Sequence, residues 1–252
     1  MPASAKLRRA VNISATYSGS SIYLGNRSNV ADINMQLRTA AINVVTAEYA
    51  KQDSDITFTA IISDITENST NSYVNGGHVQ FKINGLTLRN EDDTPISVAV
   101  VNNMARYTYH IPKGTSAITN DGLIKNYTVT ASYDNKAYYL GVKNNTTYHV
   151  DPYKVEVTFK EVKVQDNLLS IKADMKDDDG YYITGRNKVA IKINGKTYQE
   201  NGKVKYFNIQ NGKVDLSGIN TNGTIVKEVT LVSGARDAYL GVRATTTNIV
   251  VA

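Results

Sequence analysis

The acidic residues between positions 174 and 180 form the densest group of potential metal ligands in the sequence. Asp174, Asp177, Asp178 and Asp179 precede Gly180 there. Calcium binds about six to eight oxygen ligands, and a turning loop rich in carboxylates can supply them. Aspartate and glycine also favour turns for backbone reasons alone, and the spacing differs from that of an EF-hand. We therefore expect either a plain turn or a calcium site formed by Asp174, Asp177 and Asp179, and no other cofactor.

Residues that could carry out catalysis are sparse. The three histidines, His78, His110 and His149, lie far apart in predicted strands, and the chain has no cysteine. Histidines without cysteines are a poor zinc set, so we expect them at the surface of strands. No serine-nucleophile, zinc-protease or phosphate-binding motif occurs. Carboxylates suited to glycosidic cleavage could still converge from distant loops, but we expect the protein not to be an enzyme.

The aromatic residues suggest a surface that could bind sugars. The chain has 17 Tyr, 4 Phe and no Trp. Tyrosine suits a half-exposed sheet because its ring packs on neighbours while its hydroxyl stays in water. Sugars stack on aromatic faces, and Tyr138, Tyr139, Tyr181 and Tyr182 are the candidates for such contacts. The absence of Trp argues against glycan binding as the main function.

Charge and hydropathy restrict the possible partners. The 252 residues include 28 basic and 23 acidic residues, which gives a formal net charge of +5. Basic and acidic residues are interleaved, so we expect no nucleic-acid partner. No apolar segment approaches the roughly 20 residues that a membrane span requires. Residues 1–9 carry basic side chains without a following apolar segment, so we expect no secretory signal among them.

The pattern that must position these residues is that of β-strands. Apolar and polar residues alternate over 78–84 and again over 189–193, and each run ends at an Asn-Gly pair typical of a hairpin turn. Further strands rich in Val, Ile, Thr and Tyr are predicted at 56–62, 106–111, 127–133, 154–159 and 168–173. Short strands separated by turns predict an all-β protein built of antiparallel sandwiches.

A repeated tripeptide divides the chain into domains. Tyr-Leu-Gly occurs at 23–25, 139–141 and 239–241, separated by 116 residues (23 to 139) and 100 residues (139 to 239). Solenoid repeats are about 20–50 residues long, so this period is that of a domain. We predict a domain at 39–151 and another at 152–252, with Asp151-Pro152 as linker. The tripeptide is expected near the start of each last strand, with Tyr or Leu inward and Gly allowing a bulge or close strand approach.

Residues 1–38 are expected to hold only the last two strands of a like domain. A lone hairpin is marginally stable in water and needs a sheet to join. Three explanations remain open: an arbitrary cut through a preceding domain, docking of the hairpin on the domain at 39–151, or donation of a strand to a neighbouring chain.

Four segments carry a resemblance to a known family. Residues 56–60, 75–85, 105–112 and 126–133 resemble the bacterial Ig-like repeats of adhesin-like surface proteins from methanogenic archaea and some bacteria. The resemblance covers nearly the whole chain. It implies tandem Ig-like sandwiches, in which Tyr127 would bond back to the backbone at a sheet corner. The domain at 152–252 departs from the pattern, since Lys227 replaces Tyr127, Ser233 replaces Tyr133 and Arg186-Asn187 replaces the glycine pair.

The resemblance also implies a function. We expect a non-enzymatic, extracellular stalk of the cell surface whose partners are neighbouring Ig-like domains and a cell-surface glycan or protein. The alternative is a carbohydrate-binding accessory module of an extracellular, wall-active enzyme. The sequence leaves the ligand, the host and the oligomeric state open.

Overall fold

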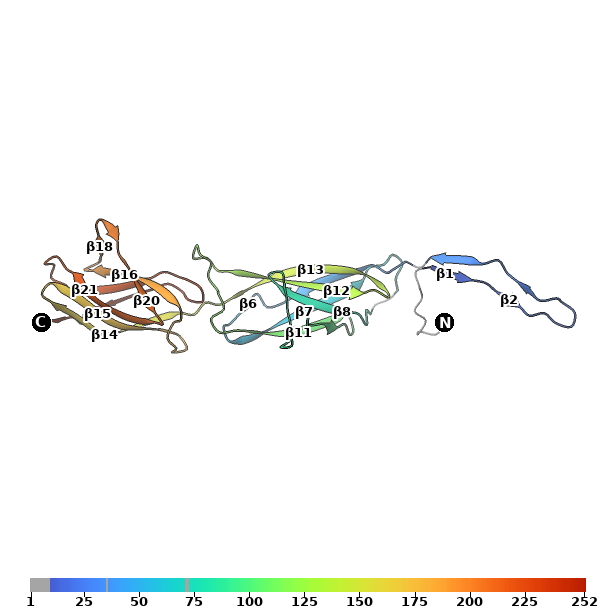
Figure 1. Ribbon diagram of the computed structural model, residues 1–252, viewed down its shortest axis with the longest axis horizontal. Helices are drawn as coiled ribbons and strands as arrows, with labels where there is room; N and C mark the ends of the chain where they lie inside the picture. The colour runs from blue at the N-terminus through green and yellow to red at the C-terminus, as the bar shows by residue number, and fades with distance from the viewer. Residues whose placement is uncertain (1–9, 35, 71–72) are drawn as a thin grey trace. The chain divides into compact units, whose positions relative to one another are not determined.

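The computed structural model describes residues 10–34, 36–70 and 73–252 (Figure 1). Every regular element in this range is a β-strand, so the predicted all-β class is confirmed. No helix that could span a membrane occurs in the described part of the chain.

The N-terminal segment is a twice-paired antiparallel hairpin. Strand β1 (Ala10–Ile13) pairs with β4 (Ala31–Asn34), and β2 (Thr16–Tyr17) pairs with β3 (Asn26–Arg27). The first Tyr-Leu-Gly lies in the loop between β2 and β3 with Tyr23 and Leu24 exposed, so the expected place at the start of a strand with Tyr or Leu inward is wrong for this copy. The two strands expected in this region are thus present, each interrupted once.

The strands between Ala40 and Val150 form two sheets (Figure 1). One sheet has the order β11-β7-β5, and the other has the order β10-β8-β12-β13-β6 with β9 paired to β8. The first sheet comprises β5 (Ala40–Val45), β7 (Ser54–Asp64) and β11 (Met104–Ile111). The second comprises β6 (Tyr49–Ala50), β8 (His78–Ile83), β9 (Leu86–Thr87), β10 (Val98–Ala99), β12 (Asn126–Asn135) and β13 (Tyr139–Val150).

Apart from β18 and β19, the strands from Val155 onward form one nine-stranded sheet, because β20 (Tyr206–Gln210) pairs with both β16 and β21. They follow the order β23-β22-β16-β20-β21-β15-β14-β24, with β17 paired to β16 and β18 paired to β19. One group of neighbouring strands comprises β14 (Val155–Gln165), β15 (Leu168–Asp177) and β21 (Lys213–Asn220). The other group comprises β16 (Arg186–Ile193), β22 (Val229–Ser233) and β23 (Val242–Thr246). The remaining strands are β17 (Lys196–Thr197), β18 (Gln199–Glu200), β19 (Lys203–Val204), β20 (Tyr206–Gln210) and β24 (Val250–Val251).

The strand order identifies the fold. In an Ig-like sandwich the A, B and E strands share one sheet and the C, F and G strands share the other. The groups β5-β7-β11 and β8-β12-β13 have this order, and so do β14-β15-β21 and β16-β22-β23. The chain therefore contains tandem Ig-like antiparallel β-sandwiches, as predicted.

Alternation with period two builds the core of each sandwich. Along β7 the buried residues are Ile56, Phe58, Ala60 and Ile62, and along β15 they are Leu169, Ile171, Ala173 and Met175. Burying each large side chain contributes about 1.5–3 kcal/mol. The period continues past these apolar residues to Asp64 and Asp177 at the ends of the two strands.

The predicted Asn-Gly hairpin turns are present. Asn84 and Gly85 have φ values of 49° and 83°, and Asn194 and Gly195 have 48° and 78°. Two successive positive φ values define the tight hairpin turn whose twist matches that of the strands. The asparagine side chains also fix the turns in place, since Asn84 Oδ1 accepts from the Thr128 amide and Asn194 Oδ1 accepts from the Lys227 amide.

The chain folds as two compact units whose boundaries cross the predicted ones. The first unit contains the chain up to Val45 together with 58–107 and 128–146, and the second contains 46–57, 108–127 and 147–252. Segments 46–57 and 108–127 therefore pack with the C-terminal half, which the sequence did not predict. The predicted boundaries at 38 and 151 stay predictions.

Candidate functional site

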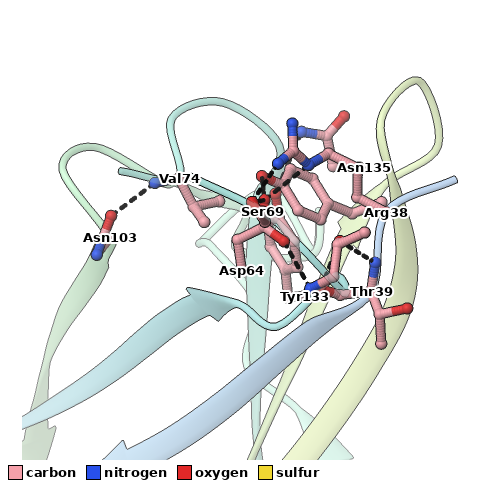
Figure 2. A network of polar contacts seen from close by, with 10 residues as sticks. Arg38, Thr39, Asp64, Ser69, Val74, Asn103, Tyr133 and Asn135 are labelled. Carbon is pink, nitrogen blue, oxygen red and sulfur yellow. Dashed lines mark hydrogen bonds and ion pairs between the residues drawn. The ribbon is translucent and has the colours of Figure 1, made fainter. Parts of the chain in front are cut away.

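A buried carboxylate at the end of β7 is the centre of a polar network in the first unit. The Asp64 side chain is fully buried, and its position follows Ile62 on the core face of the strand. Arg38 places Nε 2.7 Å from Asp64 Oδ2. Figure 2 shows Asp64 with Arg38 and Ser69 beside it. An ion removed from water costs free energy unless such partners compensate it.

Hydrogen bonds complete the surroundings of Asp64. The Thr66 amide donates to Oδ1 at 2.9 Å, while Ser69 Oγ and the Tyr139 hydroxyl each donate to Oδ2 at 3.1 Å. The Arg38 guanidinium also donates to Ser69 Oγ. Burial by itself would raise the pKa of Asp64, but the hydrogen bonds from Thr66, Tyr139 and Ser69 lower it well below its usual value. The carboxylate is therefore ionised at neutral pH.

The second Tyr-Leu-Gly copy connects this network to the sheet. Tyr139 is 5% exposed and begins β13, whereas Leu140 points outward. Arg38 and Tyr139 form a parallel β-bridge, in which the Arg38 amide donates to the Tyr138 carbonyl and the Leu140 amide donates to the Arg38 carbonyl. Arg38 also lies over the Tyr139 ring, 6.0 Å from its centroid. The expected position near the start of the last strand, with Tyr inward, is confirmed here.

The third copy repeats the same backbone geometry. Tyr153 and Tyr239 form a parallel bridge, the Tyr153 amide donates to the Ala238 carbonyl, and the Leu240 amide donates to the Tyr153 carbonyl. Tyr239 is 7% exposed. Tyr153 thus occupies the place that Arg38 occupies in the first sandwich. Burial and the nearby Asp179 and Asp177 carboxylates raise the pKa of Tyr153 to about 12, so its hydroxyl stays neutral.

The glycine of the tripeptide differs between the copies. A Cβ on Gly241 would lie 3.0 Å from the Ala235 amide nitrogen, and one on Gly25 would lie 3.0 Å from the Ser18 carbonyl oxygen. These two positions confirm the expected close strand approach. At Gly141 the nearest such atom is 3.6 Å away, an ordinary contact, so there is no close strand approach at this copy.

The three predicted calcium ligands do not lie together. Asp174 and Asp177 both belong to β15, three positions apart, so their side chains project to opposite faces of the strand. The expectation that both lie in a turn is wrong because β15 extends to Asp177, beyond its predicted end at 173. Asp179 is exposed in the turn that follows. Within the described residues no group of three acidic or histidine side chains could hold a metal ion.

Asp174 instead belongs to a cluster of lysines and tyrosine. Lys213 Nζ and Lys160 Nζ lie 3.3 and 3.6 Å from its carboxylate oxygens, and the Tyr182 hydroxyl donates to Oδ2 at 3.0 Å. Burial raises the pKa of Asp174, but the Tyr182 and Lys213 hydrogen bonds and the lysine charges lower it overall. The two lysines supply positive charge where a calcium ion would have to bind, so this geometry gives the predicted calcium site no support.

The histidines are dispersed over the strands. His78 and His110 are exposed, and His149 is partly buried. His110 lies 3.0 Å from Asp55 and 3.2 Å from Asp53, and the hydrogen bond to Asp55 is the main cause that raises its pKa. These positions agree with the expected strand histidines.

Tyr127 forms the predicted corner. Its hydroxyl donates to the Ser116 carbonyl at 2.5 Å, eleven residues upstream, and its ring stacks on Tyr148 with centroids 5.4 Å apart. This is the arrangement of a tyrosine corner near the start of an F strand. Lys227, which replaces Tyr127 in the second sandwich, is exposed.

Of the four tyrosines considered for sugar contacts, one is excluded by its burial. Tyr139 is 5% exposed, and its hydroxyl is used by Asp64, so the expectation of an exposed ring is wrong. Tyr138 and Tyr181 are 59% and 63% exposed. Lys113 Nζ lies 3.4 Å from the Tyr181 ring centroid, and Lys213 Nζ lies 4.0 Å from that of Tyr182. Lysines therefore already occupy ring faces of Tyr181 and Tyr182.

The burial of Asp64 and Asp177, and the pairing of Asp177 with Lys113, were not foreseen from the sequence. A count with period two from the apolar residues of each strand would have placed both acids on the core face. Both acids also stand at the same position relative to an inward Ala, Ala60 in one strand and Ala173 in the other. No such count could identify the partner of Asp177, which comes from a distant segment.

No protein-family model matches the chain, and no curated protein matches it. Among solved structures, the titin Ig tandem domains A164–A165 match 86% of this chain and 99% of their own, at 9% identity and a TM-score of 0.40. Bacteroides uniformis β-glucuronidase 3 matches at 12% identity and Parabacteroides merdae β-glucuronidase at 9%, both with a TM-score of 0.24. Each match covers 83% of this chain and 25% of the glucuronidase.

The buried Asp64 carboxylate closes the first sandwich. The Asp64 side chain has no solvent-exposed surface, and its donors come from Arg38, from the loop after β7 and from the start of β13. A substrate could not reach it without opening the strands. What Asp64 can do is hold Arg38, the end of β7 and the start of β13 together in the first sandwich, whereas the contacts of Asp177 are to the Tyr181 amide and Lys113.

Proposed function

We propose that this chain is part of a non-enzymatic, extracellular stalk whose tandem sandwiches hold an adhesive region away from the cell surface. The main support is that, in each sandwich, one of the first strands pairs in parallel with the last strand. His149 and Val150 of β13 pair with Tyr49 and Ala50 of β6. Lys163 and Val164 of β14 pair with Val250 and Val251 of β24.

Parallel pairing of the terminal strands resists extension. When the two ends of such a sandwich are pulled apart, the paired strands slide along each other, and all bonds between them are loaded together. In an antiparallel hairpin pulled at its open end, the bonds instead break one after another. The bonds in question are backbone hydrogen bonds at 2.9–3.0 Å, from the His149 amide to Glu48, from the Asp151 amide to Ala50 and from the Ala252 amide to Val164.

Single-molecule force spectroscopy of the chain, held at its two ends, tests this proposal. We expect two separate unfolding events, each releasing roughly 350 Å of extended chain, since a domain of about 100 residues spans up to 3.6 Å per residue. Both events should occur at forces well above those of a hairpin opening from its end. Unfolding in one low-force event, or without resolved events, would exclude the stalk.

A carbohydrate-binding accessory module of a wall-active enzyme is the second candidate. The observation that favours it is a pocket of about 400 Å³ lined by Asp53, Lys113, Gly114, Tyr181, Tyr182, Thr184 and Tyr239. Tyrosine rings beside an acid and a base can contact the faces and hydroxyls of a sugar. A glycan array probed with the chain and with its Tyr181→Ala variant distinguishes the two candidates. A carbohydrate-binding module gives a signal that the variant loses, whereas a passive stalk gives no signal.

A further inference from the structure

The two sandwiches bury an equivalent carboxylate but compensate its charge differently. Asp64 pairs with Arg38, from the start of its own sandwich. Asp177 stands at the equivalent end of β15, with its side chain 1% exposed, but Tyr153 occupies the place of Arg38. A neutral tyrosine cannot balance a carboxylate.

We propose that Lys113 supplies the missing cation and thereby fastens segment 108–127 to the second sandwich. Lys113 Nζ lies 3.8 Å from Asp177 Oδ2. Asp177 Oδ1 accepts a hydrogen bond from the Tyr181 amide at 2.8 Å, whereas Oδ2 has no hydrogen-bond donor among the described residues. Among the residues that the structure describes, Lys113 is therefore the cation that pairs with Asp177 Oδ2. The proposal holds whether or not the chain is a stalk.

Aromatic rings hold the ammonium group of Lys113 in position. Its Nζ lies 3.4 Å from the centroid of the Tyr181 ring and 5.5 Å from that of Tyr153. A cation over the face of a tyrosine ring is attracted to it, more strongly where water is partly excluded. Tyr153 thus replaces the charge of Arg38 with a surface that accepts a cation from elsewhere.

Backbone bonds attach the same segment at a second point. The Ala117 and Ile118 amides both donate to the Asp237 carbonyl at 2.7 Å, and Ile118 and Asp237 form an antiparallel bridge. Ala117 and Ile118 are buried. The segment is therefore attached at two points, through the ion pair of Lys113 with Asp177 and through the backbone hydrogen bonds to Asp237.

The consequence is that the second sandwich is incomplete without a residue that precedes the predicted boundary at 151. Loss of Lys113 leaves a buried carboxylate without its counter-charge, and that is strongly destabilising in proteins. Lys113 is 37% exposed at its side chain, so solvent reduces the effect.

Hydrogen–deuterium exchange of the whole chain, resolved by peptide, tests this inference. In Lys113→Met we expect exchange to accelerate by about fivefold or more in peptides covering β15, β16 and residues 115–120, with no change in β8 and β12. Lys113→Arg should exchange like the wild type. Lys136→Met is the matched control, because Lys136 pairs with Asp134 at the same 3.8 Å but is 90% exposed.

Two further variants separate charge from packing. In an Asp177→Asn background the Lys113→Met change should have little effect, because the buried charge is gone. Tyr153→Arg combined with Lys113→Met should restore slow exchange, because the arginine would supply the cation as Arg38 does. If Lys113→Met leaves exchange unchanged, or accelerates it equally in the Asp177→Asn background, the inference is overturned. If Lys113→Met prevents folding, rescue by Tyr153→Arg supports the inference and absence of rescue contradicts it.

Discussion

A buried aspartate at the end of β7, Asp64, is the residue on which the first sandwich closes. Asp64 gathers Arg38, Thr66, Ser69 and Tyr139 around one carboxylate. The most distant of these donors, Tyr139, lies 75 residues from Asp64 in sequence. A charged group that is fully compensated in this way fixes the register of the strands around it, whereas apolar residues of similar size could slide by two positions.

Asp64 should make the stability of the first sandwich depend on acid pH. Its folded pKa lies below the ordinary value of 3.8, so its contribution is present above about pH 4 and is lost as pH falls further. We expect Asp64→Asn to lower the free energy of unfolding at pH 7 by about 1–3 kcal/mol. The difference from wild type should shrink between about pH 4 and pH 2.

Urea titrations at several pH values measure this difference. Asp134→Asn serves as control, because Asp134 makes an exposed pair with Lys136. A difference between Asp64→Asn and wild type that stays constant down to about pH 2 would show that Asp64 has no depressed pKa.

Tyr127 offers a second test at this scale. Tyr127→Phe removes the hydroxyl that donates to Ser116 and keeps the ring on Tyr148. We expect a loss of about 1 kcal/mol, the net value of a typical hydrogen bond, together with the cost of the carbonyl left unpaired. Urea denaturation of Tyr127→Phe beside the exposed Tyr138→Phe measures it, and equal midpoints would show that the corner bond contributes nothing.

At the scale of elements, the turn before β8 sets where β8 begins. Gly76 and Gly77 precede β8 with φ values of 80° and 75°. A Cβ on Gly77 would lie 2.7 Å from Asn135 Cβ and from the Asp134 carbonyl oxygen. The Tyr133 hydroxyl donates to the Gly76 carbonyl at 3.2 Å. The glycine pair therefore lets the start of β8 pass directly against the end of β12.

Replacing Gly77 should disturb this passage more than replacing a glycine in open space. Gly77→Ala combines an unfavourable φ with overlap against backbone, and we expect a loss of about 3 kcal/mol or more. Gly85→Ala has a similar φ of 83° and no atom within 4 Å, so we expect only about 1 kcal/mol. Thermal unfolding of both variants compares them, and equal losses would mean that the close approach at Gly77 does not matter.

At the scale of the whole molecule, the parallel pairing at the ends of each sandwich is the feature that could carry load. The His149 amide donates to the Glu48 carbonyl, on the side of β13 that faces β6. Proline at this position removes that bond. The pair between β14 and β24 is unaffected, so it provides an internal reference within the same chain.

In force spectroscopy His149→Pro should lower the rupture force of one of the two unfolding events and leave the other unchanged. The physical reason is that fewer bonds then share the load between β6 and β13. Two events that both keep their wild-type forces would show that the load is carried elsewhere.

Several features of the fold could be predicted from sequence because they depend on local patterns. Alternation with period two located β7, β8, β11, β12 and β16 to within three residues, and the Asn-Gly pairs located two hairpin turns. It missed β21, and β14 and β15 continue past their predicted ends at 159 and 173. The tripeptide marked the start of the last strand at Tyr139, and Tyr127 makes its corner bond. Each of these features is decided by neighbouring residues or by an unavoidable step in closing a sandwich.

The sequence by itself determined the all-β class, several of the long strands, two hairpin turns and the repetition. Only the tertiary structure decided the chemistry of the acids, because the environment of a carboxylate depends on residues far away in the chain. Asp174 and Asp177 seemed to be shared ligands in one turn, yet the strand places them on opposite faces. Asp174 pairs with Lys160 and Lys213, whereas Asp177 pairs with Lys113, 64 residues upstream (177 − 113). Charge compensation acts through space, and no local pattern records it.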